Sequence, residues 1–177
     1  MSSMQTLSDE QRRILARWAA DCAERVLPLF DAGEAVATDQ IRDAVARTRA
    51  YSAGESTAAE EIGKRFVAVK AAKAATTLAG AAAARAVAQA SAVAHMGAHA
   101  LGTAAYAAKA VSLANPDRPE AVTDEIRWQI AHLSASQREA LKQLPPLGAD
   151  SSGPLAPGLL SRGVLGSTIR EIQAQIS

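Results

Sequence analysis

Cysteine, aromatic residues, a charge excess and long apolar runs are all scarce in this sequence, and each scarcity argues against a class of protein. The single cysteine, Cys22, cannot form an internal disulfide, which favours a reducing, cytoplasmic environment. The 19 basic and 18 acidic residues leave a net charge of +1, which gives no indication of nucleic-acid binding. No apolar run reaches the roughly 18 residues of a membrane span, and MSSMQTLSDEQRR lacks the pattern of a signal peptide. We therefore expect a soluble protein without a membrane partner.

Alanine is the residue in excess: the chain has 43, and 23 of them lie between Ala68 and Ala114. Alanine has the highest intrinsic helix propensity, and its small side chain lets helices approach closely. Strand signals and hairpin turns are nearly absent. The sequence predicts an all-α, single-domain bundle of about six to eight helices with an alanine-rich central helical pair. We expect large residues such as Trp18 and Phe66 to anchor its core.

Several helix ends can be read from local patterns. Ser8 is followed by Gln11 at the spacing of a capping box, and Ser134 is followed by Gln137 in the same way. Pro28 lacks a backbone N–H and should end or kink the first helix. We expect a second helix to begin after a cap at Thr38.

The alanine-rich tract is too long for one straight helix in a chain of this size. A helix from Ala81 to Asn115 would be about 50 Å long, so we predict a break between Ser91 and Gly97. One long central helix is the alternative. Gly80 is expected to end the helix before this tract.

The composition changes near the C-terminus, where LPPLGADSSGPLAPG contains four prolines and three glycines in 15 residues. The last helix should carry Ile169, Ile172 and Ile176 on one side, and it would dock on the bundle or on another subunit of a homo-oligomer. The sequence thus divides into a helical bundle domain over residues 1–147, a Pro/Gly-rich connector over 148–166 and a C-terminal amphipathic helix over 167–177.

Two histidines interrupt the alanine tract at a spacing that brings side chains to one helical face. His95 and His99 are four residues apart, a separation that can chelate a transition metal. The segment HMGAH lacks the glutamate that HExxH proteases use as general base. We therefore expect hydrogen bonds to neighbouring groups, or a polar role in a ligand or partner site. We assign no catalytic residue, no metal and no cofactor.

The first helix carries most of the charged residues that we single out. Asp21 and Arg25 are four residues apart, the spacing of a surface ion pair. Arg12, Arg13 and Arg17 form a basic cluster, which is typical of a solvated face and less often of a site for an anionic partner.

Three blocks of this sequence resemble one family of small bacterial proteins. They are LARWAADCAERVLPLF from Leu15 to Phe30, AVAHMGAHALGTAAYAAKAV from Ala92 to Val111 and IRWQIAHL from Ile126 to Leu133. With the segments between them they resemble the Imm-5-like group of putative immunity proteins over residues 8 to 147. The resemblance implies an all-helical bundle and neutralisation of a protein toxin by direct binding, with no catalytic residues to transfer.

Three functions follow as hypotheses, and the one ranked last is a metal-dependent enzyme that uses His95 and His99. The first is an immunity-type protein that binds a toxin without catalysis. The second is a drug- or natural-product-binding resistance protein that holds a small hydrophobic ligand between its helices. We expect the pocket of the second to be lined by the aromatic and histidine side chains of Trp18, His95, His99, Tyr106 and Trp128.

Overall fold

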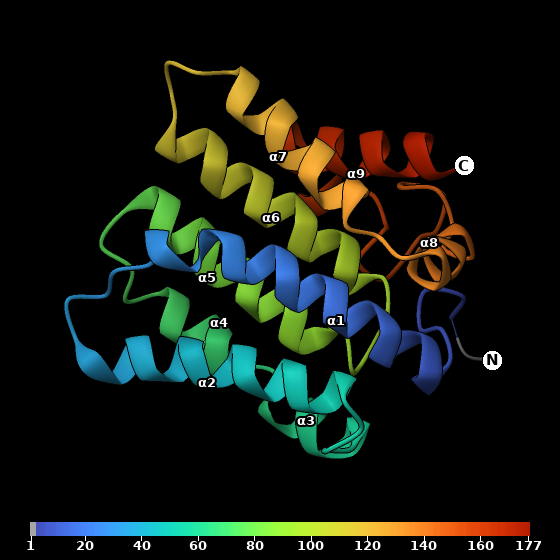
Figure 1. Cartoon of the computed structure of the whole chain (residues 1–177), viewed down its shortest axis with the longest axis horizontal. Helices are drawn as coiled ribbons and strands as arrows, with labels where there is room; N and C mark the ends of the chain where they lie inside the picture. The colour runs from blue at the N-terminus through green and yellow to red at the C-terminus, as the bar shows by residue number, and fades with distance from the viewer. Residues whose placement is uncertain (1–2) are drawn as a thin grey trace.

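The computed structural model describes residues 3–177, and within them it contains nine α-helices, two short 3-10 helices and no strand. The predicted all-α bundle is therefore confirmed. The α-helices, in chain order, are α1 (Asp9–Val26), α2 (Ala35–Ser52), α3 (Ala58–Lys64), α4 (Val67–Ala72), α5 (Leu78–Ala92), α6 (His99–Ala114), α7 (Glu120–Ala131), α8 (Ala135–Lys142) and α9 (Gly163–Ile176). Figure 1 shows α1, α5 and α6 at the centre, with α2, α3 and α4 on one side and α7 and α9 on the other.

The two alanine-rich helices, α5 and α6, form the most extensive helix pair in the described residues. The helical conformation is interrupted between Ala92 and His99. This confirms the predicted interruption and excludes one long helix. The amides of Gly97 and Ala98 donate to the carbonyl oxygens of Thr6 and Gln5, at 2.9 and 3.0 Å. The N-terminal segment thus takes the hydrogen bonds that would otherwise have continued the helix.

The core is built from many small side chains and a few large ones. Trp18, Tyr51 and Ile41 are almost completely buried, whereas most of the buried residues of α5 and α6 are alanines. Phe66, expected to be a second anchor, is 59% exposed. The helix that was expected to end at Gly80 is interrupted, with α3 and α4 separated at Arg65 and Phe66, and the Phe66 ring at this break is exposed.

The helix starts that depend on neighbouring residues are confirmed. Ser8 Oγ accepts from the Gln11 amide at 3.1 Å, while Gln11 Oε1 accepts from the Ser8 amide at 3.0 Å. Ser134 and Gln137 make the same reciprocal pair. The first helix ends at Val26, and Pro28 lies in the short 3-10 helix Leu27–Leu29 that follows it.

Two expected boundaries are wrong. Thr38 does not cap α2, which begins at Ala35; its hydroxyl donates to the Glu34 carbonyl oxygen inside the first turn. Gly80 does not end a helix, because it lies in the first turn of α5, where its amide donates to Thr77 Oγ1. A Cβ at Gly80 would lie 2.9 Å from the Leu29 carbonyl oxygen, so glycine permits a close approach here.

The C-terminal helix α9 packs on the bundle, mainly against α6. It begins at Gly163, before the expected start at Ser167, and Ile169, Ile172 and Ile176 are buried as its amphipathic pattern predicted. The division of the chain into a bundle, a connector and a separate last helix stays a prediction. No helix within residues 3–177 combines the length and apolar character needed to cross a membrane.

Gln5 links the N-terminal segment to the connector that precedes α9. Its buried side chain donates from Nε2 to Asp150 Oδ2 and to the Ser152 carbonyl oxygen, both at 2.8 Å. Its Oε1 accepts from the Leu155 amide at 2.9 Å. We call these contacts the Gln5 clasp.

Candidate functional site

Two of the five predicted site residues lie in the core. Trp18 is completely buried on α1, and its indole N–H donates to the Gln129 carbonyl oxygen at 2.9 Å. Gln129, on α7, donates from Nε2 to the Ala104 carbonyl oxygen of α6 at 3.0 Å. Tyr106 is 3% exposed on α6. Trp18 and Gln129 therefore join three helices, which gives Trp18 a structural role.

His99 is the first residue of α6, and it contacts α5 through its ring. Its Nδ1 lies 2.8 Å from Gln89 Oε1, an oxygen that accepts, so the ring carries its proton on Nδ1. Burial, reinforced by the charges of His95 and Arg65, lowers the pKa of His99 to about 4. A Cβ at Gly102 would lie 2.2 Å from the same Gln89 oxygen. Gly102 therefore leaves the space in which this hydrogen bond forms.

His95 is exposed in the turn between α5 and α6. Desolvation and the nearby guanidinium groups of Arg65 and Arg12 lower its pKa. No helix contains both histidines, so the expected shared helical face is wrong. Among residues 3–177, no group of three or more histidine, cysteine or acidic side chains is placed to hold a metal ion.

Trp128 forms a partly exposed stack at the junction of α1 and α7. Its ring stacks on His132 at a centroid separation of 3.8 Å, and the Arg25 guanidinium lies 3.9 Å from its ring centroid. Arg25 also binds the buried Glu125 carboxylate, with its NH2 nitrogen 2.8 Å from Oε2. The expected Asp21–Arg25 pair is wrong, because Asp21 binds Arg49 of α2 instead.

The five predicted residues thus lie in separate places. Trp18 and Trp128 lie where α1 meets α7, Tyr106 lies in α6, and His95 and His99 lie at the α5–α6 turn. The four surface grooves described for this structure are lined by other residues. A pocket shared by the five residues stays a prediction.

The largest of these grooves, which we call the α1–α2 groove, has a volume of about 1120 Å³. It runs between α1, the C-terminal half of α2 and the start of α8. Its lining residues are Glu10, Arg13, Ile14, Arg17, Asp21, Ala46, Arg49, Ala50, Ser52, Ala53, Glu55, His132, Ser134, Ser136 and Gln137.

Ion pairs and hydrogen bonds between helices fix the walls of the α1–α2 groove. Arg13 binds Asp9 at 2.8 Å and donates to the Tyr51 carbonyl oxygen, so it ties α1 to α2. Arg49 bridges Asp21 and Glu24 of α1, with 2.7 Å to each carboxylate. These contacts join α1 to α2 along the groove.

The same contacts shift the pKa values of two groups beside the groove. Hydrogen bonds from Arg13 and Tyr51 lower the pKa of Asp9. Burial and the hydrogen bond to Asp9 raise the pKa of Tyr51 to about 12. Both groups therefore keep one protonation state near neutral pH, with Asp9 charged and Tyr51 neutral.

Arg17 differs from Arg13 and Arg49, the other two arginines that line the groove, which both form ion pairs. It is exposed, and no carboxylate in residues 3–177 lies within ion-pair distance of it. The sequence identified Arg17 only as part of a basic cluster. Its neighbours Arg12 and Arg13 both pair with Asp9.

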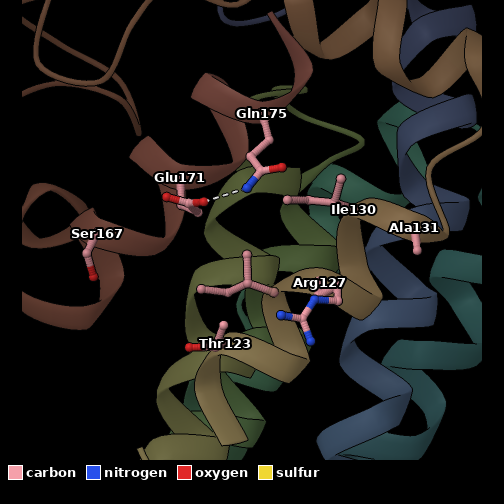
Figure 2. Close-up of a pocket in the computed structure, with 8 residues that line it drawn as sticks. Thr123, Arg127, Ile130, Ala131, Ser167, Glu171 and Gln175 are labelled. Atoms are coloured by element: carbon pink, nitrogen blue, oxygen red, sulfur yellow. Dashed lines mark hydrogen bonds between the residues drawn. The ribbon is translucent and has the colours of Figure 1, made fainter. Parts of the chain in front are cut away.

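A smaller groove of about 540 Å³, which we call the α7–α9 groove, lies between those two helices. Figure 2 shows Ile130 extending from α7 toward α9, while Glu171 and Gln175 extend from α9 and share a hydrogen bond of 2.7 Å. Sequence patterns missed this groove, because its lining combines residues of two helices that lie far apart in the chain. On α7 the buried residues are Glu125 and Gln129.

The comparisons with known proteins give one match. No curated protein and no solved structure shows a significant match to the chain. The family model described as Imm-5 like putative immunity protein matches residues 5–136, which include the whole of α1 to α7 and all but one residue of the α1–α2 groove. This range is most of the 177-residue chain, so the protein belongs to the Imm-5 like putative immunity protein family.

Proposed function

We propose that this protein neutralises a bacterial toxin by binding it directly, without catalysis, and that the toxin docks on the α1–α2 groove. The observation that carries the proposal is the location of this groove. Its lining, from Glu10 to Ser136, lies within the matched residues 5–136, with Gln137 just outside. The α7–α9 groove, in contrast, depends on α9, which lies outside that range. A function common to the family is therefore better supported at the α1–α2 groove.

The side chains at one edge of the groove favour a protein partner. His132 lines the groove, and Trp128 stacks on its ring with Arg25 against the indole. Tryptophan and arginine are the residues most often found at binding hot spots, where a partly exposed ring becomes fully buried on association. Arg17 adds a charged group that is free to pair with a carboxylate of the partner.

The charges of the groove are balanced. Glu10, Asp21 and Glu55 oppose Arg13, Arg17 and Arg49. Long-range electrostatic steering should therefore contribute little to the association rate. The affinity should come from close contact and from burial of the Trp128 stack, so it should depend only weakly on salt.

The absence of catalysis and the cytoplasmic location are parts of this proposal. Cys22, the one thiol of the sequence, is buried, and burial with the nearby Glu125 raises its pKa well above the ordinary value. A nucleophilic cysteine needs the opposite shift and an accessible sulfur. A single unpaired thiol also fits the reducing bacterial cytoplasm. The alternative, a small hydrophobic ligand bound among Trp18, His95, His99, Tyr106 and Trp128, has weaker support because these residues lie apart.

The proposal can be tested by mixing the purified chain with the purified products of adjacent genes. We expect one of them to form a complex at micromolar concentration in size-exclusion chromatography and calorimetry. Arg17→Glu and His132→Ala should weaken it. Arg85→Glu is the matched control, since Arg85 is an exposed arginine on α5, which does not line the groove. No complex at micromolar concentration, or equal losses for Arg17→Glu and Arg85→Glu, would contradict the proposal.

A further inference from the structure

The α7–α9 groove lies over a face of α7 on which apolar side chains remain partly accessible. Helix α7 places Glu125 and Gln129 against the bundle and leaves Ile126 and Ile130 half-buried. The two polar residues are held there by Arg25, by the Trp18 indole and by the Ala104 carbonyl oxygen. The isoleucines consequently face a groove of about 540 Å³. Ile126 and Ile130 pack in part against the core, and the rest of each side chain lines the groove.

The size of the groove fits a small molecule. Pockets that hold drug-sized ligands measure roughly 300 to 1,000 Å³ and combine an apolar surface with a few polar groups. Ile126, Ile130 and Ala131 supply the apolar surface on α7. Ser167, Glu171 and Gln175 supply the polar groups on α9, as Figure 2 shows.

The polar wall on α9 offers mainly hydrogen-bond acceptors. The Ser167 hydroxyl donates to the Val164 carbonyl oxygen at 3.2 Å, so it has acceptor capacity left. Glu171 receives one hydrogen bond, from Gln175 Nε2, and no basic side chain of residues 3–177 lies within ion-pair distance of it. Arg127, on the opposite wall, is already paired with Asp124 at 3.1 Å. The uncompensated charge at this groove is therefore negative.

We propose that the α7–α9 groove binds a small apolar molecule that carries a protonated amine. The apolar body lies on Ile126 and Ile130, and the ammonium group donates hydrogen bonds to Glu171 and Ser167. This site is separate from the proposed toxin surface, because the two grooves have no lining residue in common. Either proposal can fail without the other.

Three naphthalene probes that differ in one group test the charge requirement. Naphthylmethylamine is cationic at neutral pH, naphthylmethanol is neutral and naphthylacetate is anionic. Each is titrated into the full-length, isotope-labelled protein, and amide chemical shifts report both the affinity and the place of binding. We expect saturable shifts at residues 123–131 and 167–175, with the amine binding about fivefold or more tightly than the alcohol, as for one exposed charge pair.

Two variants separate the roles of charge and apolar surface. Glu171→Gln should lower the affinity for the amine by about fivefold and leave the affinity for the alcohol unchanged. Ile130→Ser should lower the affinity for both the amine and the alcohol. Because Ile130 is only half-buried, the variant should stay folded. Glu60→Gln is the control, an exposed glutamate on α3 with the same chemical change and no expected effect. No saturable binding of any probe, equal affinity for amine and alcohol, or shifts outside these two segments would overturn the proposal.

Discussion

Gln89 and His99 join the two alanine-rich helices through one hydrogen bond, in which His99 Nδ1 donates to Gln89 Oε1 at 2.8 Å. The bond lies beside the break between α5 and α6, where the chain reverses direction. Alanine side chains offer no polar contacts, so this pair supplies directional specificity that close packing lacks. It also explains why a histidine occurs in this tract.

The first prediction concerns the space around the Gln89 side chain. Gly102→Ala places a Cβ about where Gln89 Oε1 lies, so the Gln89 amide must move and its bond to His99 breaks. Loss of a half-buried hydrogen bond costs about 1–3 kcal/mol, while alanine restores up to about 1 kcal/mol of helix propensity. We expect a net loss of roughly 1 kcal/mol in urea unfolding.

Gly63→Ala is the matched control for this experiment. Gly63 is an exposed helical glycine on α3, and a Cβ there would have no neighbour within 4 Å. We expect this variant to be more stable than the wild type by up to about 1 kcal/mol. Equal effects of the two substitutions would show that Gln89 does not need the space beside Gly102.

The second prediction is a pH dependence of stability. The folded-state pKa of His99 is about 4, whereas an unfolded histidine titrates near its ordinary value of 6.5. Between these values the unfolded chain binds the additional proton, so the free energy of unfolding should fall as pH decreases from about 6.5 to about 4. The contribution of His99 is complete above this window and reaches about 3 kcal/mol.

This pH dependence can be assigned to one residue by substitution. His99→Gln should flatten the profile in the window, because glutamine keeps a donor for Gln89 but does not titrate there. Asp9 affects stability in a lower pH range. Because its pKa is lowered in the folded state, its contribution to the free energy of unfolding is lost only as the pH falls below the ordinary value of 3.8. An NMR titration that gives His99 an ordinary pKa would contradict the prediction.

The third prediction concerns Arg25, which covers both the Glu125 carboxylate and the Trp128 ring. Arg25→Met leaves Glu125 buried without its charged partner, and we expect a loss of about 1–3 kcal/mol in the free energy of unfolding. The indole becomes more exposed to water, so tryptophan emission should shift to longer wavelength. Adding Glu125→Gln should recover part of the stability, and a double variant as unstable as Arg25→Met alone would count against the ion pair.

The fourth prediction concerns the Gln5 clasp. Gln5→Ala removes three hydrogen bonds to the connector and leaves the buried Leu155 amide without an acceptor. We expect a loss of about 1–3 kcal/mol and faster amide hydrogen exchange over residues 148–158. Unchanged exchange in this segment would mean that α9 alone fixes the connector.

Local features of the fold could be predicted from the sequence because their causes are local. The capping boxes at Ser8 and Ser134, the helix end near Pro28 and the break after Ala92 each depend on residues within one or two turns. The start of α2 was misplaced, since its first turn begins at Ala35 without a capping side chain.

Long-range contacts could not be predicted in this way. Asp21 and Arg25 have the spacing of a helical pair, yet each finds a better partner on another helix, Arg49 and Glu125. The orientation of α7 likewise depends on the buried contacts of Glu125 and Gln129, which no periodicity in α7 reveals. Both candidate grooves combine residues from separate helices, so they became visible only in the folded chain.

The Gln5 clasp also constrains the order of events during synthesis on the ribosome. Gln5 emerges early, but the Leu155 amide that it accepts from is 150 residues later in the chain. The Gln5 side chain therefore lacks its native partners until these 150 further residues have been translated. Contacts of such large sequence separation form late. We expect the N-terminal segment to become fixed only after the segment around Leu155 has been translated, when the alanine-rich pair has already formed.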